Sequence, residues 1–304
     1  MSSDWSSDVC SSDLGAWPVF IDADPVTWQM DSSRVVDFLR EKCRCKSGKV
    51  FNKDTRRRVR AILPVHILGH PVDMDPILEV AREIGLPVIE DATESLGAKY
   101  KGRSVGAMGD VSCLSFNGNK LITTGGGGML LTENDEWAEK ARYLSTQAKD
   151  DPVEYVHNNI GYNYRLTNIQ AAMGCAQAEL VDEYIKKKRK IAEEYNRKFL
   201  EVDGIYPLQQ KKWAKSTFWL YAVRISRNHI SGGRIPAMRK LAEKGIQTRP
   251  LWLPIHLNKP YHEKPDLRLK ESKSIHDSAL CLPCSVGIKS SEIRRIGKIL
   301  VNGE

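Results

Sequence analysis

Residues 61–91 read AILPVHILGHPVDMDPILEVAREIGLPVIED and contain the alternation that decides the fold class. The run 61–65 is short and continuously apolar, as in a strand buried on both faces, and PVIE at 87–90 reads as the next strand. Between them, apolar residues recur at helical spacing, namely Met74, Ile77, Leu78, Ala81 and Ile84. A strand, a helix and a second strand in this order predict parallel neighbours in one sheet.

The sequence also predicts where this helix begins and ends. Asp73 has the side chain of an N-cap, and Pro76 falls in the first turn, where proline is tolerated. Gly85 follows the last apolar position and predicts the end of the helix.

The same alternation of strands and helices continues before and after this segment. Further strands are expected at 19–22, 111–116, 129–132 and 217–224, and further helices at 33–40 and 235–244. Thr167 and Gln170 form a capping-box pattern that opens a long helix towards Phe199. These elements predict an α/β protein with a mostly parallel sheet covered by helices on both faces. We expect a large domain at 15–185 and a smaller C-terminal α+β domain at 186–304.

Charge and composition exclude several classes of function. The chain has 304 residues, 41% of them apolar, a net charge of +8, and no apolar run of membrane-spanning length. Part of the charge lies in the run 186–190, which is predicted to be a solvated helix face, and residues 41–60 are expected to form a basic surface excursion. We therefore expect no nucleic-acid partner and no membrane association.

Seven scattered cysteines argue against a disulfide framework and for a reducing, cytoplasmic setting. Cys43 with Cys45 and Cys281 with Cys284 have close spacings, but neither pair has a histidine at finger-like spacing. No metal site is therefore expected.

Residues 1–14 repeat Ser-Ser-Asp without a helical or strand period. Such a segment cannot contribute to a core, and it lacks the apolar centre of a signal peptide. It resembles translated adapter sequence, and we expect it to be an artefactual or disordered leader that replaces a native N-terminal segment.

Asp91 is the first candidate for a functional residue, because it follows a predicted strand. In open α/β sheets, ligands bind beyond the carboxyl ends of the strands, where a carboxylate can hold a cationic atom. The alternative is a helix N-cap, since residues 91–94 also fit a capping box.

Lys120 is the second candidate. It lies in a loop after the strand 111–116, close to Ser115 and followed by Thr123, Thr124 and the glycines 125–128. Glycines and hydroxyls can hold a phosphate, and a lysine held near apolar strands can lose its proton and bond to a carbonyl cofactor. The lysine follows the strand but precedes the glycines, which excludes a Walker loop. The alternative is a surface lysine beside a plain hairpin turn.

The third candidate is the segment 161–166, which reads GYNYRL and precedes the capping box. Asn163 and Arg165 could reach an anion near a helix start. The alternative is a surface loop with two packed tyrosines.

Together, the segments 90–98, 115–120 and 161–172 resemble, in order and spacing, the DegT/DnrJ-type nucleotide-sugar aminotransferases. The glycine run, where most of that family has Glu in place of Gly126, resembles the legionaminic-acid and bacillosamine subgroup. So do PVHILGH at 64–70 and EYVH at 154–157. The resemblance implies a fold type I enzyme that depends on pyridoxal 5'-phosphate. It implies amination of a nucleotide-linked 4-keto-6-deoxy sugar carrying a 2-acetamido group, with glutamate as donor.

The resemblance also implies a role for each candidate. Lys120 would carry the cofactor and move the proton, Asp91 would pair with the pyridine nitrogen, and Ser115 would bind the phosphate. Glu94 would lie beside the ring hydroxyl, where Gln is common. Asn163 would reach the cofactor phosphate of a neighbouring subunit, which implies a homodimer with shared sites.

The sequence leaves several alternatives to this function open. The family's phosphate-binding Gly-Thr turn, which precedes the part that begins here at Gly15, has no counterpart in residues 1–14. A non-catalytic or inactive truncated relative is therefore one alternative. A perosamine-type synthase without the 2-acetamido preference is another. A dehydratase of this family would have His in place of Lys120.

Overall fold

The computed structural model describes residues 15–151, 153–261 and 269–302. The helices α2 (Ser32–Glu41) and α3 (Met74–Ile84) lie where the periodicity placed them. Asp31 caps α2 through its side chain, and Gly85 ends α3 in the left-handed conformation. Their apolar faces, with Val35, Leu39 and Ile77, form one hydrophobic core. The strand expected at 19–22 is wrong, since only Ala23 makes a bridge, to Met30.

The central sheet contains β4 (Ile89–Asp91), β7 (Val111–Ser115) and β8 (Gly128–Leu131), in that order. β4 and β7 are parallel, and the run 61–65, expected as a strand, joins the sheet through isolated parallel bridges from Ile62 to Val88 and from Val65 to Asp91. β8 is antiparallel to β7. No helix forms between Ser115 and Gly128, so the chain returns as a hairpin rather than as a parallel crossover. The central sheet is therefore parallel except at β8, as expected for a mostly parallel α/β sheet.

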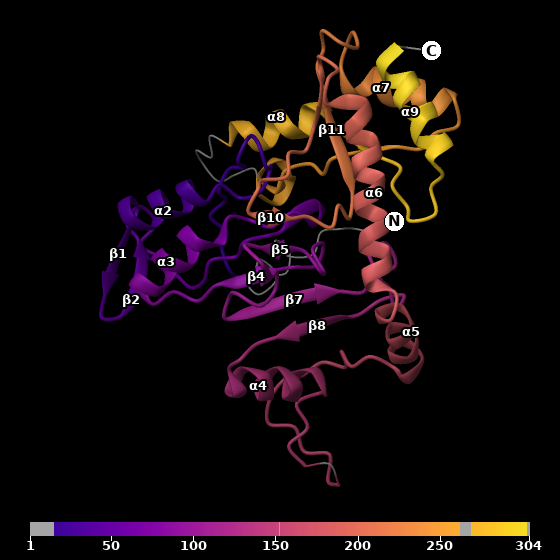
Figure 1. Ribbon diagram of the computed structural model, residues 1–304. Coiled ribbons are helices and arrows are strands. Elements are labelled where there is room, and N and C mark those ends of the chain that lie inside the picture. Colours follow the sequence, from indigo (N-terminus) through magenta and orange to yellow (C-terminus); the bar gives the residue numbers. More distant parts are fainter. Residues whose placement is uncertain (1–14, 152, 262–268, 303–304) are drawn as a thin grey trace.

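Two small antiparallel sheets flank this centre. The first contains β1 (Cys43–Lys46), β2 (Lys49–Asn52) and β3 (Arg58–Val59), and is the ordered form of the basic excursion. In Figure 1 its strands β1 and β2 lie at the margin of the molecule beside α2. The second contains β5 (Lys99–Tyr100), β6 (Arg103–Ser104) and β10 (Ala214–Lys215).

The C-terminal part is built on a four-stranded antiparallel sheet. Its order is β12 (Arg249–Pro250), β13 (Ala279–Leu282), β11 (Tyr221–Ile225) and β9 (Ile205–Pro207). The helices α6 (Val181–Phe199), α7 (Arg234–Glu243) and α9 (Ser290–Asn302) pack on it around a second core. A smaller core containing Leu68, Leu251 and Ala279 joins this part to the N-terminal half.

The connection between the halves differs from the expected single helix. The capping box of Thr167 and Gln170 is confirmed at the start of α5 (Asn168–Ala178). α5 ends at Ala178, and α6 starts again at Val181, so that two helices replace one. Figure 1 shows α6 running from the level of the central sheet to the C-terminal sheet. The domain division at residue 186 remains a prediction.

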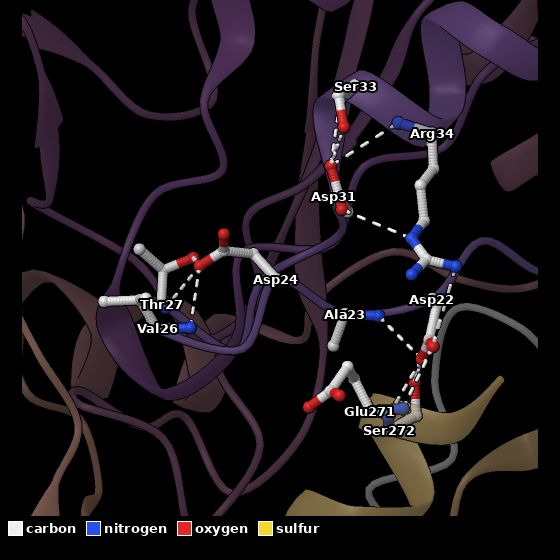
Figure 2. A network of polar contacts seen from close by, with 10 residues as sticks. All are labelled: Asp22, Ala23, Asp24, Val26, Thr27, Asp31, Ser33, Arg34, Glu271 and Ser272. Atoms are coloured by element: carbon white, nitrogen blue, oxygen red, sulfur yellow. Dashed lines mark hydrogen bonds and ion pairs between the residues drawn. The ribbon is translucent and has the colours of Figure 1, made fainter.

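The helix α4 (Asp135–Ser145) follows β8, and short 3-10 turns occupy η1 (Ile67–Gly69), η2 (Ile255–Leu257) and η3 (Lys259–Tyr261). The remaining helix, α8 (Lys270–Ser278), is held by a residue from the far end of the chain. The buried Asp22 accepts hydrogen bonds from the amides of Glu271 (3.0 Å) and Ser272 (2.8 Å) and from the Ser272 hydroxyl (2.6 Å). Figure 2 shows this network, in which Asp22 satisfies amides at the start of α8.

Burial and hydrogen bonding act in opposite directions on Asp22. Burial alone raises its pKa, but the hydrogen bonds from Ser272, Glu271 and Ala23 together hold the pKa of this carboxyl below its ordinary value.

The expected leader, residues 1–14, lies outside the described residues. Within the part of the chain that the structure covers, no helix combines the length and the apolar content needed to cross a bilayer.

Candidate active site

Asp91 lies at the carboxyl end of β4, and its side chain is buried. Its parallel partner in β7 is Cys113, and Ser115 lies two residues further along, at the carboxyl end of β7. The alternative role of Asp91 as a helix N-cap is not found, because turns rather than a helix follow it. Its Oδ1 instead accepts a hydrogen bond from the Thr93 amide (3.0 Å). The two strand ends therefore bring a carboxylate and a hydroxyl to the same edge of the sheet.

Lys120 is not a surface lysine. Its side chain is only 4% exposed, and its Nζ lies 3.9 Å from the Glu94 carboxylate. The other oxygen of Glu94 accepts a hydrogen bond from the Leu68 amide (2.8 Å), which fixes the carboxylate. Leu68 itself has a positive φ within the turn η1, so the PVHILGH segment shapes this contact. The structure thus brings together the lysine and the acidic residue that the sequence picked out separately.

The loop that carries Lys120 is closed by the glycine run. The Phe116 amide donates to Gly127 O (3.0 Å), and the Thr124 amide donates to Phe116 O (2.9 Å). Gly128 pairs with Ser115 across the hairpin. The glycines therefore form the hairpin turn that was the alternative interpretation, and they return the chain from the lysine loop to β8. Ser115 accepts from the Asn117 amide at 3.3 Å.

Trp219 is the site residue that sequence reasoning missed. Lys120 Nζ lies 4.4 Å from the centre of its ring, and its indole N–H donates to Asn119 O (2.9 Å). Trp252 stacks on it, with ring centres 6.1 Å apart and planes tilted by 7°. In the sequence, Trp219 is one apolar residue in a predicted strand. Nothing in that pattern indicates contact with a lysine about a hundred positions away.

A buried hydrogen bond joins His66 to Glu90, the residue that precedes Asp91. His66 Nδ1 accepts a hydrogen bond from the Val72 amide (2.9 Å), so His66 Nε2 carries the hydrogen that faces Glu90 (3.1 Å). Glu90 also accepts from the Gly106, Met108 and Gly109 amides. Burial raises the pKa of Glu90, but the hydrogen bonds from His66 and these amides lower it below its usual value overall. Through these hydrogen bonds, Glu90 ties the strand that ends in Asp91 to His66 and to the segment 106–109.

Asn163 and Arg165 are placed differently. Both are exposed, in the loop between α4 and α5, and Asn163 forms an antiparallel bridge with Thr146. Within the described chain, neither side chain forms a hydrogen bond or ion pair with the cluster of Asp91, Glu94, Ser115 and Lys120.

The cluster has the chemistry that pyridoxal phosphate requires. A buried primary amine faces an acidic group and an aromatic ring, and a second buried carboxylate and a hydroxyl stand at the neighbouring strand ends. An amine can bond to the cofactor's aldehyde, a carboxylate can pair with its protonated ring nitrogen, and a hydroxyl can bind its phosphate. The residues present therefore fit this cofactor.

Comparison with known proteins agrees with this chemistry. The model of the DegT/DnrJ/EryC1/StrS aminotransferase family matches residues 5–301. A GDP-perosamine synthase of Caulobacter vibrioides is 37% identical over 93% of this chain and 72% of its own length. EpsN of Bacillus subtilis, whose name describes a pyridoxal phosphate-dependent aminotransferase, is 36% identical over 94% of this chain and 72% of its own. The crystal structure of the aminotransferase TlmJ from Streptoalloteichus hindustanus superposes with a TM-score of 0.84 at 27% identity, covering 97% of this chain and 75% of that one.

Proposed function

We propose that this chain, which belongs to the DegT/DnrJ/EryC1/StrS aminotransferase family, aminates the 4-keto carbon of a nucleotide-linked 4-keto-6-deoxy sugar. The family and its relatives make it a pyridoxal-phosphate-dependent sugar aminotransferase. The observation that carries the proposal is the buried Lys120 amine, 3.9 Å from Glu94 and beside the sheet edge that ends in Asp91. Glutamate is proposed as the amino donor.

The cofactor supplies an electron-withdrawing ring that stabilises charge at the carbon where the amino group is exchanged. Lys120 is proposed to carry the cofactor through its Nζ and to move the proton between donor and product carbons. Its low exposure keeps water from the amine. Asp91 is proposed to hold the proton on the ring nitrogen, Ser115 to bind the phosphate, and Glu94 to orient the lysine and the ring hydroxyl.

Two sugar classes are candidates for the substrate. The PVHILGH segment and the glycine run favour a 2-acetamido sugar, as in the legionaminic-acid and bacillosamine subgroup. The similarity to a GDP-perosamine synthase favours a 4-keto-6-deoxy sugar without that group. Incubation with UDP- and GDP-linked 4-keto-6-deoxy sugars of both kinds, with glutamate, separates the two by which product mass appears.

The lysine assignment has a direct test. Pyridoxal phosphate is added to the purified chain, the mixture is reduced with borohydride, and the peptides are mapped by mass. We expect the reduced adduct on Lys120 and none in Lys120→Ala, while Lys101→Ala, which removes a half-exposed lysine elsewhere, keeps the adduct. An adduct that persists in Lys120→Ala would contradict the assignment.

The active form is proposed to be a homodimer, with Asn163 reaching the phosphate of the neighbouring copy's cofactor. The exposure of Asn163 supports this, as does α5, which has no buried residue although Ile169 (80% exposed) and Met173 (44%) are apolar. A cytoplasmic location is supported by free thiols at Cys43, Cys45, Cys175, Cys281 and Cys284.

A further inference from the structure

The positive charge of this chain is concentrated in one place. Residues 41–60 contain nine Lys or Arg and two acidic residues, a net charge of +7, whereas the whole chain carries +8. The remaining 284 residues are therefore almost neutral. The run 186–190 is the most obvious basic segment in the sequence, but acidic residues elsewhere balance its charge. One of its lysines, Lys188, is buried and donates a hydrogen bond to Cys284 O (2.7 Å).

Strand pairing arranges these charges on one side of a small sheet. Arg44 pairs with Phe51, and Phe51 pairs with Arg58, so these three side chains form a row across β1, β2 and β3. Lys46 pairs with Lys49 two positions further along the same side. We call these five residues the basic face. The opposite side has the buried residues Cys43, Val50 and Asn52, so the basic face points away from the core.

Nothing in the described part of the chain neutralises the basic face. Its four cations are exposed, and none of them forms an ion pair or hydrogen bond with a described residue. Like charges directly opposite each other, as at Lys46 and Lys49, are unfavourable in a free sheet. A bound anionic surface would relieve this repulsion.

We propose that the basic face docks the enzyme on an anionic phospholipid surface. The face carries four exposed cations around one half-buried ring, which matches an array of headgroups. Beside it, the Arg57 guanidinium lies 3.5 Å from the centre of the Trp17 ring, and Trp17 is 58% exposed. Exposed tryptophan next to cations is typical of side chains that sit at headgroup level. A single-stranded nucleic acid fits less well, because base stacking needs open ring faces, whereas Phe51 is half-buried and Arg57 covers one face of Trp17.

This proposal does not depend on the sugar substrate, and it departs from the expectation that the chain has no membrane partner. Its test is co-sedimentation of the full chain with vesicles of 30% phosphatidylglycerol in phosphatidylcholine, and with phosphatidylcholine alone. We expect binding to the anionic vesicles at 0.1 M salt and release at 0.5 M, because salt screens exposed charges.

The decisive variant is Arg44→Gln with Arg58→Gln. At about 1 kcal/mol for each cation near the lipid surface, it should weaken binding roughly 30-fold. The matched control is Lys186→Gln with Lys190→Gln, which removes two exposed charges from α6 and should leave binding within about threefold. Circular dichroism should show both variants folded, since all four side chains are exposed.

Three outcomes would overturn the proposal. They are no binding of the wild type to anionic vesicles, equal losses in the two double variants, and tighter binding to a single-stranded oligonucleotide than to the vesicles. The second would mean that net charge alone acts, and the third that the face recognises nucleic acid.

Discussion

His70 is a neutral imidazole enclosed by the protein. It is fully buried, its Nδ1 donates to Pro71 O (2.8 Å), and its Nε2 accepts from the Lys211 amide (3.4 Å). Burial is the main reason that its pKa falls to about 4. In the unfolded chain the pKa of a histidine is about 6.5. As the pH falls from about 6.5 towards 4, His70 therefore binds a proton in the unfolded state but remains neutral in the folded state.

We expect this residue to make the fold sensitive to mild acid. The free energy of unfolding should fall by about 3 kcal/mol between pH 6.5 and pH 4 on account of His70. In His70→Gln that part of the pH dependence should disappear, although the variant is less stable at pH 7. Urea unfolding at several pH values measures it, with His157→Gln, at an exposed histidine, as the control. An unchanged pH dependence in His70→Gln would refute the account.

At the scale of elements, the glycine run offers a matched pair of substitutions. A Cβ on Gly128 would lie 2.5 Å from the carbonyl oxygen of Leu114 in the neighbouring strand, whereas one on Gly126 would meet only the Gln170 side chain at 3.8 Å. Neither glycine has a positive φ, so space alone separates them.

Gly128→Ala should therefore force β7 and β8 apart and cost about 1–3 kcal/mol of unfolding free energy. Gly126→Ala should change stability by less than about 0.5 kcal/mol. Chemical denaturation of both variants checks the prediction, which fails if the two lose similar stability. The open position of Gly126 also fits the Glu that most of the wider family has there.

The start of α8 depends on Asp22, as Figure 2 shows. Asp22→Asn keeps the size of the side chain but removes its charge and half of its acceptor capacity. We expect a loss of about 1–2 kcal/mol at pH 7.

This loss should shrink as the pH falls. The pKa of Asp22 is held below its ordinary value, so its contribution is present above about pH 4 and disappears as the carboxylate is protonated at lower pH. Thermal unfolding of Asp22→Asn at pH 7 and pH 3 measures both effects. The control Asp37→Asn removes an exposed acid without a hydrogen bond to the described chain, and should be neutral. Equal effects of the two substitutions would contradict the role of Asp22.

For the whole molecule, the proposed shared-site dimer makes a prediction about mixtures. Lys120→Ala and Asn163→Asp should each inactivate the homodimer, the latter by placing a negative charge against the phosphate. A mixed dimer of the two has one intact site, so random mixing should restore roughly a quarter of the wild-type sites. The measurement is transaminase activity after the two tagged variants are co-expressed and purified together.

The control mixes Lys120→Ala with Asp91→Asn. Both substitutions affect residues of the same copy's site, so every site in the mixed dimer is defective and no activity should return. Recovery in the control, or none in the test mixture, would exclude the shared arrangement.

Much of this molecule could be predicted because the signals are local. The helix α3 was predicted from apolar residues spaced along one face and from Gly85, and the start of α5 from Thr167 and Gln170. Asp91 and Lys120 became candidates because each follows a predicted strand, but the family resemblance, and not the local pattern, favoured them over the alternatives and gave Ser115 its role. Local patterns therefore predicted most element types and their order, since helix and strand periods depend only on near neighbours.

Which of these residues come into contact is set by the packing of segments that are far apart in the sequence. The contact of Lys120 with Trp219, the burial of Lys188 and the antiparallel return of β8 arise between segments whose spacing carries no period. The basic face likewise exists because pairing of β1, β2 and β3 turns alternate residues to the same side. Such contacts depend on how whole elements pack and in which register they pair, and a one-residue shift of register would reverse the two faces.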